Sequence, residues 1–276
     1  MKIIQMADKV RYPRMTTQEL RETFLVSDLF GAGKVNMVYV DLDRTVVGGA
    51  TPTSAALKLE TAPELRAEYF LERREIGIFN IGAAGIVAVD GEAHRLEHLD
   101  CLYAGRGARD VTFASDDAAA PAQYYLLSYP AHAEHPTRLS KKDDLHAVQL
   151  GAKETLNRRQ IRKHVWMGGV RSCQLVMGFT ELEQGSGWNT MPPHTHMRRS
   201  EVYMYYGLTP EDRVLHLMGP ADETRHLLVA DKDVVISPGW STHAGVGTRN
   251  YSFCWGMGGE NQAYDDMDGL KISDLR

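Results

Sequence analysis

Short apolar runs separated by turn residues follow one another through most of the 276-residue chain. Glycine or an Asp-Gly pair stands after several of them. Short strands at regular spacing, with glycine turns between them, are typical of a β-sandwich or β-barrel. The runs lie at residues 35–40, 45–47, 76–81, 85–89, 101–104, 111–113, 202–206, 214–218, 225–229 and 234–236. The pattern therefore predicts an all-β fold with a few short helices.

Two local signals are more specific. Asp90-Gly91 follows the alternating run 85–89, and this pair favours the tight turn of a β-hairpin. Near the N-terminus, Thr16 precedes Glu19 and a spaced set of apolar residues, which is the pattern of a capped helix. We therefore expect a hairpin turn at residues 90–91 and one short helix over residues 16–25.

A His-x-His pair, His194 and His196, marks a candidate metal site. Side chains on a strand repeat their direction every second position, so these two imidazoles would share one face. Glu201 lies an odd number of positions from both, and one continuous strand would send it to the opposite face. We therefore place a turn in residues 197–200, with Glu201 opening the next strand. Such a pair alone is more often a surface feature than a metal site.

A fourth candidate ligand, His243, follows the run 234–236 and a Pro-Gly turn at residues 238–239. Three imidazoles and one carboxylate would then converge. This donor set suits zinc, iron, manganese or nickel, whereas calcium and magnesium prefer oxygen ligands. Four protein ligands could close a structural zinc site, while catalysis needs a position open to water or substrate.

The order of His-x-His, glutamate, Pro-Gly turn and later histidine resembles the paired motifs of the cupin superfamily, small β-barrels that hold a metal in their mouth. Three loop lengths differ from the usual cupin pattern: those before His194, after Glu201 and after His243. We interpret them as loop variations that leave the ligand set intact. The resemblance implies an open cradle, which favours a catalytic metal.

Longer segments resemble one family, the 5-keto-4-deoxyuronate isomerases of bacterial pectin degradation. The similarity runs nearly end to end, and its most specific segments are residues 70–77, 223–226, 255–262 and 265–268. It implies conversion of 5-keto-4-deoxyuronate (4-deoxy-L-threo-5-hexosulose uronate) to 3-deoxy-D-glycero-2,5-hexodiulosonate. This aldose-ketose isomerisation passes through an enediolate, whose charge a divalent metal would stabilise. We expect one zinc ion per chain, with manganese, iron or nickel as alternatives, and the resemblance implies a homohexamer.

The second half of the chain echoes the first. Residues 198–201 repeat the arginine and glutamate pattern of residues 73–75, and residues 233–236 echo residues 100–103. We therefore predict two cupin-like β-barrel or jelly-roll repeats, residues 1–145 and residues 146–276. The first repeat has no His-x-His pair, so we expect the metal site in the second repeat alone.

The sequence does not identify the base that carries the proton. We name Lys163, Tyr205 and His226 as candidates. Most basic runs like that of Lys163 are solvated faces or subunit contacts, a tyrosine at position 205 more often lines the barrel, and a packed or surface histidine explains His226 about equally well. An anionic sugar acid also needs a cation in its pocket, and arginine pairs bidentately with carboxylate. Arg199 and Arg225 compete with Lys163 for that role, and the sequence does not choose among them.

Composition narrows the class of protein. A formal charge of -5 with 43% hydrophobic residues indicates an ordinary globular chain and disfavours nucleic acid as a partner. Three widely spaced cysteines are expected to be reduced and buried. The N-terminus lacks a secretory signal, and no apolar run approaches the ~20 residues that span a bilayer. We therefore expect a cytoplasmic protein whose partners are a small anionic sugar acid and copies of itself.

Three other functions fit the same motifs. One is a neighbouring cupin isomerase that acts on 5-deoxyglucuronate from inositol breakdown. Another is a metal-stabilised cupin that binds a sugar acid without turnover, although no helix-turn-helix segment or basic patch supports a transcriptional sensor. The third is a metal-dependent dioxygenase.

Overall fold

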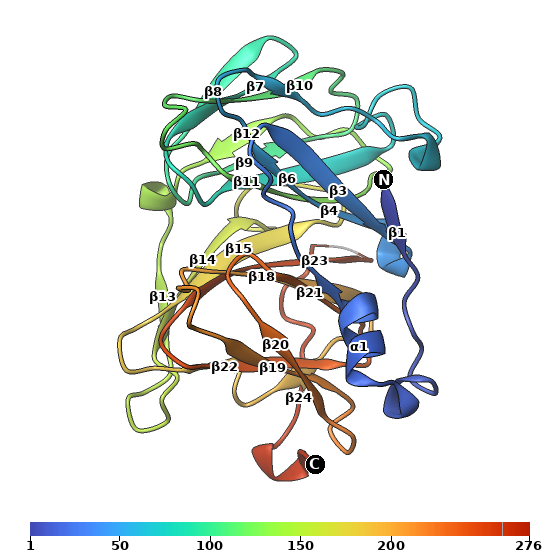
Figure 1. The fold of residues 1–276 in the computed structure, drawn as a ribbon, viewed down its shortest axis with the longest axis vertical. Helices are drawn as coiled ribbons and strands as arrows, with labels where there is room; N and C mark the ends of the chain where they lie inside the picture. Colours follow the sequence, from blue (N-terminus) through green and yellow to red (C-terminus); the bar gives the residue numbers. More distant parts are fainter. Residues whose placement is uncertain (261) are drawn as a thin grey trace. The chain divides into compact units, whose positions relative to one another are not determined.

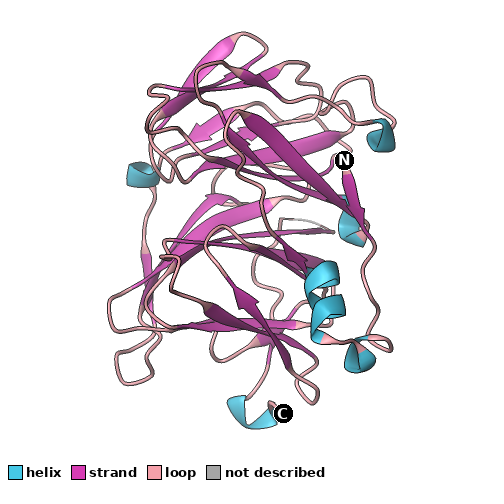
Figure 2. Cartoon of the chain, in the orientation of Figure 1, coloured by secondary structure: helices cyan, strands magenta, loops and turns pink. Residues whose placement is uncertain are grey.

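The computed structural model describes residues 1–260 and 262–276. Its elements are mostly β-strands, joined by turns and short helical segments (Figures 1 and 2). Each run predicted from the sequence overlaps a strand, so the predicted all-β class is confirmed. The chain forms two compact units, which are described separately. The first contains residues 1–4, 28–145 and 163–177, and the second contains residues 5–27, 146–162 and 178–276.

The first unit contains a seven-stranded and a four-stranded sheet. The large sheet has the order β1 (Lys2–Ile4), β3 (Lys34–Val40), β4 (Thr45–Thr51), β11 (Tyr124–Pro130), β6 (Arg74–Asn80), β9 (Cys101–Ala104) and β12 (Arg138–Ser140). The small sheet has the order β5 (Leu57–Lys58), β10 (Val111–Ser115), β7 (Gly85–Val89) and β8 (Glu92–Leu96). Apolar side chains from both sheets, such as Ile78 and Phe113, form one buried core.

The second unit repeats this arrangement. Its large sheet has the order β13 (Val148–Leu150), β14 (Arg159–Val165), β15 (Val176–Leu182), β23 (Ser252–Gly259), β18 (Arg199–Tyr206), β21 (Val234–Ser237) and β2 (Leu25–Val26). Its small sheet has the order β16 (Trp188–Asn189), β22 (Thr242–Gly247), β19 (Val214–Gly219) and β20 (Arg225–Val229). A further pair joins β17 (His194–Thr195) to β24 (Asp268–Gly269).

The two units share one topology. The order β3-β4-β11-β6-β9 in the first large sheet corresponds to β14-β15-β23-β18-β21 in the second, with the strands taken in the same sequence order. The small sheets correspond in the same way. This agreement supports two repeats. The chain passes from one unit to the other after residue 145, where we place the repeat boundary, but residues 5–27 belong to the second unit and residues 163–177 to the first.

Both local signals are confirmed. The helix α1 (Thr17–Phe24) starts with a capping box, in which the Thr16 hydroxyl accepts from the Glu19 N–H and the Glu19 carboxylate accepts from the Thr16 N–H. Asp90 and Gly91 both have positive φ and close the β7–β8 hairpin. The short 3-10 helices are η1 (Tyr12–Arg14), η2 (Leu42–Arg44), η3 (Pro63–Leu65), η4 (Lys142–Asp144) and η5 (Ile272–Asp274).

The turn expected at residues 197–200 is shorter than predicted. Strand β18 already begins at Arg199, so only Met197 and Arg198 form the bend. Arg199 and Ser200 are buried, and they pair with Gly259 and Gly258 of β23. Two bend residues are enough to reverse the direction of Glu201 relative to the histidines.

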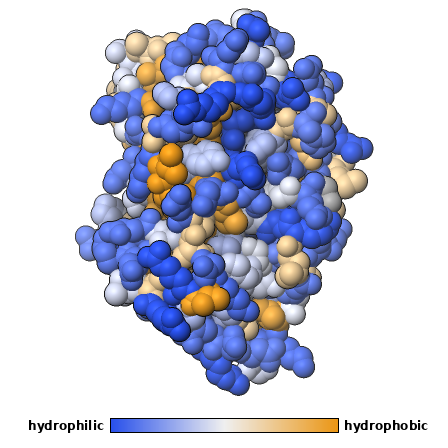
Figure 3. All heavy atoms as spheres, turned by 90° about the vertical axis from the view of Figure 1, so that its right-hand side faces the viewer, coloured by the Kyte–Doolittle hydropathy of each residue, from blue (hydrophilic) through white to orange (hydrophobic). Residues whose placement is uncertain are grey.

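The polar surface and the buried cysteines agree with what the amino-acid composition predicted. Polar residues dominate the face of the molecule drawn in Figure 3, and hydrophobic residues form only small groups on it. All three cysteines are free and buried, as predicted. Within the described residues, no helix has the length and apolar character needed to cross a bilayer.

Candidate metal centre and active site

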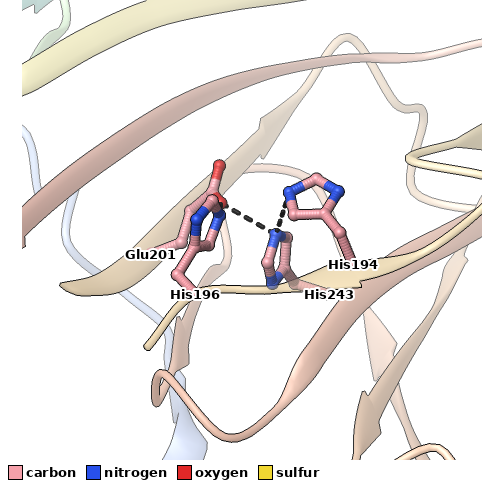
Figure 4. Close-up of side chains that lie close together, drawn as sticks. All are labelled: His194, His196, Glu201 and His243. Carbon is pink, nitrogen blue, oxygen red and sulfur yellow. Dashed lines mark hydrogen bonds and ion pairs between the residues drawn. The ribbon is translucent and has the colours of Figure 1, made fainter. Parts of the chain in front are cut away.

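Three histidines and one glutamate of the second unit point toward one another (Figure 4). Glu201 Oε2 lies 2.9 Å from His196 Nε2 and 2.8 Å from His243 Nε2. The Nε2 atoms of His194 and His243 are 3.0 Å apart. The four possible ligand atoms all lie within 4.8 Å of one another. The structure thus brings together all four residues that the sequence predicted as metal ligands.

Three separate elements deliver these side chains. His194 lies in β17 and is followed closely by His196, Glu201 lies in β18, and His243 lies in β22. The His196 N–H donates to the Gly239 carbonyl at 3.2 Å, which ties the His-x-His segment to the Pro-Gly turn. A Cβ at Gly239 would stand 2.4 Å from the His196 carbonyl oxygen, so only glycine permits this approach.

The electrostatics of the group match what a metal requires of its ligands. Burial alone would raise the pKa of the Glu201 carboxyl, but the charges and hydrogen bonds of His243 and His196 hold this pKa well below 4.5. Burial, reinforced by the charge of His243, lowers the pKa of His194 to about 3. At neutral pH the carboxyl is therefore ionised and the His194 imidazole is neutral, which are the metal-binding forms. The four residues fit a divalent transition metal and could hold one.

The group opens into a cavity of about 230 Å³. His194, His196 and Glu201 line it together with two phenols, Tyr203 and Tyr264. Burial raises the pKa of Tyr264 to about 12 and that of Tyr203 well above 10, so both phenols are protonated at neutral pH. The cavity thus combines the ligand group with two neutral hydrogen-bond donors.

One cation, Arg159 in β14, also lines this cavity. Its Nη1 donates to the Asn157 carbonyl at 2.8 Å, and burial lowers its pKa, although an arginine remains charged in proteins. Among the described lining residues, Arg159 is the single arginine or lysine. A carboxylate that entered the cavity would find its counter-charge here.

A C-terminal strap, residues 262–270, forms one wall of the cavity. Its strand β24 pairs with β17 beside His194, and its Tyr264 and Met267 line the cavity. Between them, Asp266 makes an ion pair with Arg199 and lies 3.0 Å from Arg198 Nη2. These ion pairs hold the strap against the start of β18.

Four of the residues predicted to bind substrate or a proton do not line the cavity. Arg199 is buried and held by Asp266, and Arg225 donates to the Met15 carbonyl at 3.1 Å. The buried Tyr205 hydroxyl is hydrogen-bonded to His216 Nδ1 at 2.7 Å, and His226 is exposed on β20. None of these four lines the cavity, so their roles stay predictions.

Lys163 belongs to the first unit, where its Nζ lies 4.6 Å from the centre of the Trp166 ring. Arg159 and Lys163 belong to the same basic run of the sequence, and only Lys163 was predicted as a site residue. Alternation along β14 is the signal that could have found Arg159, because Ile161 shares its face and also lines the cavity.

The two β units, with three imidazoles and a carboxylate gathered in the second, define a cupin-like protein. Solved structures with this fold include an IolB-like protein from Salmonella typhimurium LT2 (TM-score 0.71, 13% identity, covering 90% of this chain and 97% of that one). Another is an oxalate decarboxylase variant of Bacillus subtilis (TM-score 0.61, 11% identity, covering 90% and 79%). At these identities the likeness concerns the fold alone.

The model of the KduI/IolB family matches residues 24–271, and the chain belongs to this family. A relative from Kineococcus radiotolerans is 54% identical over 267 residues, covering 96% of both chains. One from Lachnoclostridium phytofermentans is 51% identical over 261 residues, covering 95% of both, and one from Escherichia coli O139:H28 is 48% identical over 264 residues, also covering 95% of both. Each is named 4-deoxy-L-threo-5-hexosulose-uronate ketol-isomerase. The family resemblance found in the sequence is confirmed.

Proposed function

We propose that this chain is a metal-dependent ketol-isomerase that converts 5-keto-4-deoxyuronate to 3-deoxy-D-glycero-2,5-hexodiulosonate. The observation that carries the proposal is one cavity lined by three of the four candidate metal ligands and, among its described lining residues, by a single arginine. A substrate with a carbonyl at one end and a carboxylate at the other needs both. The shared name of relatives about half identical over nearly the whole chain supports the same activity.

His194, His196, Glu201 and His243 would hold the metal, which we propose to be one zinc ion per chain, with manganese, iron or nickel as alternatives. When bound, a divalent metal supplies Lewis-acid stabilisation of negative charge at the substrate oxygens. Ionised Glu201 and neutral His194 supply the ligand forms that this chemistry needs.

Arg159 binds the substrate carboxylate through its guanidinium fork, which fixes the acid end of the chain. The phenols of Tyr203 and Tyr264 donate hydrogen bonds to substrate oxygens, since neither ionises near neutral pH. The Tyr203 hydroxyl is also hydrogen-bonded to Thr190 Oγ1 at 3.0 Å, which fixes its position. Trp255 and Phe253 add an apolar wall that limits access of water to the reacting carbons.

The reaction moves one proton from C2 to C1 and another between the two oxygens. Among the described lining residues, the groups able to exchange a proton are Glu201, the two histidines and the two phenols. Glu201 is the single carboxylate among them. Its Oε2 contacts both His196 and His243, so Oε1 is the oxygen that we assign to the proton at carbon. A hydride shift is the rival chemistry.

The proposal extends to the cellular setting and the partners of the protein. We propose that the protein acts in the cytoplasm on uronates released during pectin degradation, that it forms a homohexamer, and that it binds neither nucleic acid nor membranes. Strand edges in each large sheet offer surfaces that a second copy could cover. The alternative isomerase, the non-catalytic binder and the dioxygenase are not favoured, because the relatives described above are named as ketol-isomerases.

An NMR assay in D2O with 5-keto-4-deoxyuronate and 5-deoxyglucuronate as separate substrates tests the proposal. We expect turnover of the first, with deuterium at the hydroxymethyl carbon of its product, which is C1 of the substrate. Turnover of 5-deoxyglucuronate alone, or tight binding of 5-keto-4-deoxyuronate without product, would refute it. Product that contains no deuterium would point to the hydride shift.

A further inference from the structure

A second cavity, of about 160 Å³, lies in the first unit and is rich in arginine. Arg44, Arg73 and Arg74 line this arginine cavity together with Tyr39 and the single carboxylate Glu64. We propose that it is a binding site for a small hydroxylated oxyanion, a sugar acid or a sugar phosphate, separate from the metal centre. The proposal does not depend on the isomerase activity.

Arg74 is the fixed base of the site, since only 7% of its surface is exposed. Its Nε and Nη2 donate to Ser128, and Nη2 also donates to the Arg44 carbonyl at 2.7 Å. No described residue accepts a hydrogen bond from Nη1, which is therefore free to face the cavity. All of these acceptors are uncharged. Burial lowers the pKa of this guanidinium to about 10, although the charge of the neighbouring Glu75 acts in the opposite direction.

Arg44 and Arg66 lie in two loops that supply hydrogen-bond acceptors to the arginines of the cavity. Arg44, at φ 54°, and Arg66, at φ 50°, both have left-handed backbone, which costs free energy for residues other than glycine. Each offers its carbonyl to an arginine of the cavity: Arg44 accepts from Arg74, and Arg66 accepts from Arg73 Nη2. Strained loops thus direct their carbonyls inward. The exposed Arg44 guanidinium has no hydrogen-bond or ion-pair partner among the described residues.

The charges in the cavity do not cancel. Glu64 Oε1 lies 3.4 Å from the α-amino group of Met1, and Arg73 has an acidic neighbour only at 3.8 Å, Glu72. Three guanidiniums therefore face one carboxylate that already has another partner. Guanidinium forks bind carboxylate and phosphate oxygens bidentately. The phenol of Tyr39 and the Glu64 carboxylate supply a donor and an acceptor for hydroxyl groups, which is why we infer a hydroxylated ligand.

Isothermal titration of the metal-loaded full chain tests this site. The probes are D-galacturonate and D-glucose 6-phosphate, with uncharged D-galactose as the ligand control. All titrations use the Arg159→Gln background, which removes the cation of the metal-site cavity. The test variants are Arg44→Gln and Arg73→Gln, both exposed, because Arg74→Gln would also remove bonds that hold the fold. Arg138→Gln on β12, an exposed arginine of the same unit, is the matched control.

We expect one anion per chain to bind in the Arg159→Gln background, with no heat from galactose. Arg44→Gln and Arg73→Gln should each weaken binding about tenfold or more, the value of one hydrogen bond to a charged group, while Arg138→Gln should change it less than twofold. Tighter binding of D-galacturonate would identify the ligand as a sugar acid, and tighter binding of D-glucose 6-phosphate would identify it as a sugar phosphate. The proposal is overturned if neither acid binds in the Arg159→Gln background, or if the test variants bind as well as the Arg138→Gln control.

Discussion

Replacing Arg159 by glutamine tests the cavity as a sugar-acid site. Arg159 is the single basic side chain among the described lining residues, so a substrate carboxylate in this cavity depends on it. Glutamine keeps a polar side chain of smaller length but removes the charge and the guanidinium fork. The carboxylate lies at the end of the substrate opposite to C1 and C2, so its binding energy is the same in the ground state and the transition state. We therefore expect KM to rise and kcat to change little.

The expected loss of binding free energy follows from the N–H groups of Arg159 that remain available to the substrate. One Nη1 hydrogen of Arg159 is used by the Asn157 carbonyl, which leaves the second Nη1 hydrogen and Nη2 for the two carboxylate oxygens. A hydrogen bond to a charged group contributes about 1.5 to 3 kcal/mol, and two such bonds at the lower end give about 3 kcal/mol. That corresponds to a fall in kcat/KM of about two orders of magnitude. Lysine, which keeps the charge without the fork, should give a smaller loss.

Steady-state kinetics of Arg159→Gln, Arg159→Lys and the control Arg158→Gln make the comparison. Arg158 carries the same charge, lies one residue away and makes a partly exposed ion pair with Glu183 at 3.0 Å, outside the cavity. We expect the control to stay within about twofold of the parent, because such pairs contribute little. If Arg159→Gln keeps kcat/KM within threefold, or if Arg158→Gln is equally damaging, Arg159 does not bind the carboxylate.

Two further predictions concern stability and the strap. Burial, with a contribution from the His243 imidazole, lowers the pKa of His216 from 6.5 to about 3. Between pH 6.5 and pH 3 the unfolded chain therefore binds more protons than the folded chain, and the free energy of unfolding decreases as the pH falls. Between pH 7 and pH 5.5, the free energy of unfolding of His216→Gln should therefore decrease by about 1 kcal/mol less than that of the parent, as measured by urea unfolding. Equal decreases would show that His216 does not cause this pH dependence. Asp266→Asn removes the ion pair to Arg199, so hydrogen exchange in residues 262–270 should accelerate and KM should rise about tenfold, as expected for a loss of about 1.4 kcal/mol. Unchanged exchange would show that the strap does not depend on Asp266.

Most of what the sequence predicted about the fold came from patterns within a few neighbouring residues. The capping box at Thr16 and the Asp90-Gly91 turn are complete within a few residues, so the sequence alone specifies them. The central strands β11, β15 and β23 were not predicted. They are buried on both faces and lack the alternation of half-buried strands, and β23 also contains three glycines.

The ligand set could be predicted because each member has a fixed place relative to a turn or a strand. The odd spacing between His196 and Glu201 required a bend, and the structure has one at residues 197–198. Arg159 was not chosen from its basic run: alternation places it on one face with Ile161 and Lys163, but the alternation alone does not show which of the two cations on that face reaches the cavity. The ion pair between Arg199 and Asp266 joins residues 67 positions apart, and no local pattern reports such a contact.

The central claim is that the group formed by His194, His196, Glu201 and His243 holds a catalytic metal. The most direct test is the metal content of protein purified without a histidine tag, measured by mass spectrometry, paired with the isomerase assay before and after chelation. We predict one metal per chain, loss of turnover on chelation, and recovery on addition of zinc or manganese. Full turnover by metal-free protein would contradict the claim, because the active site would then have to work without this group.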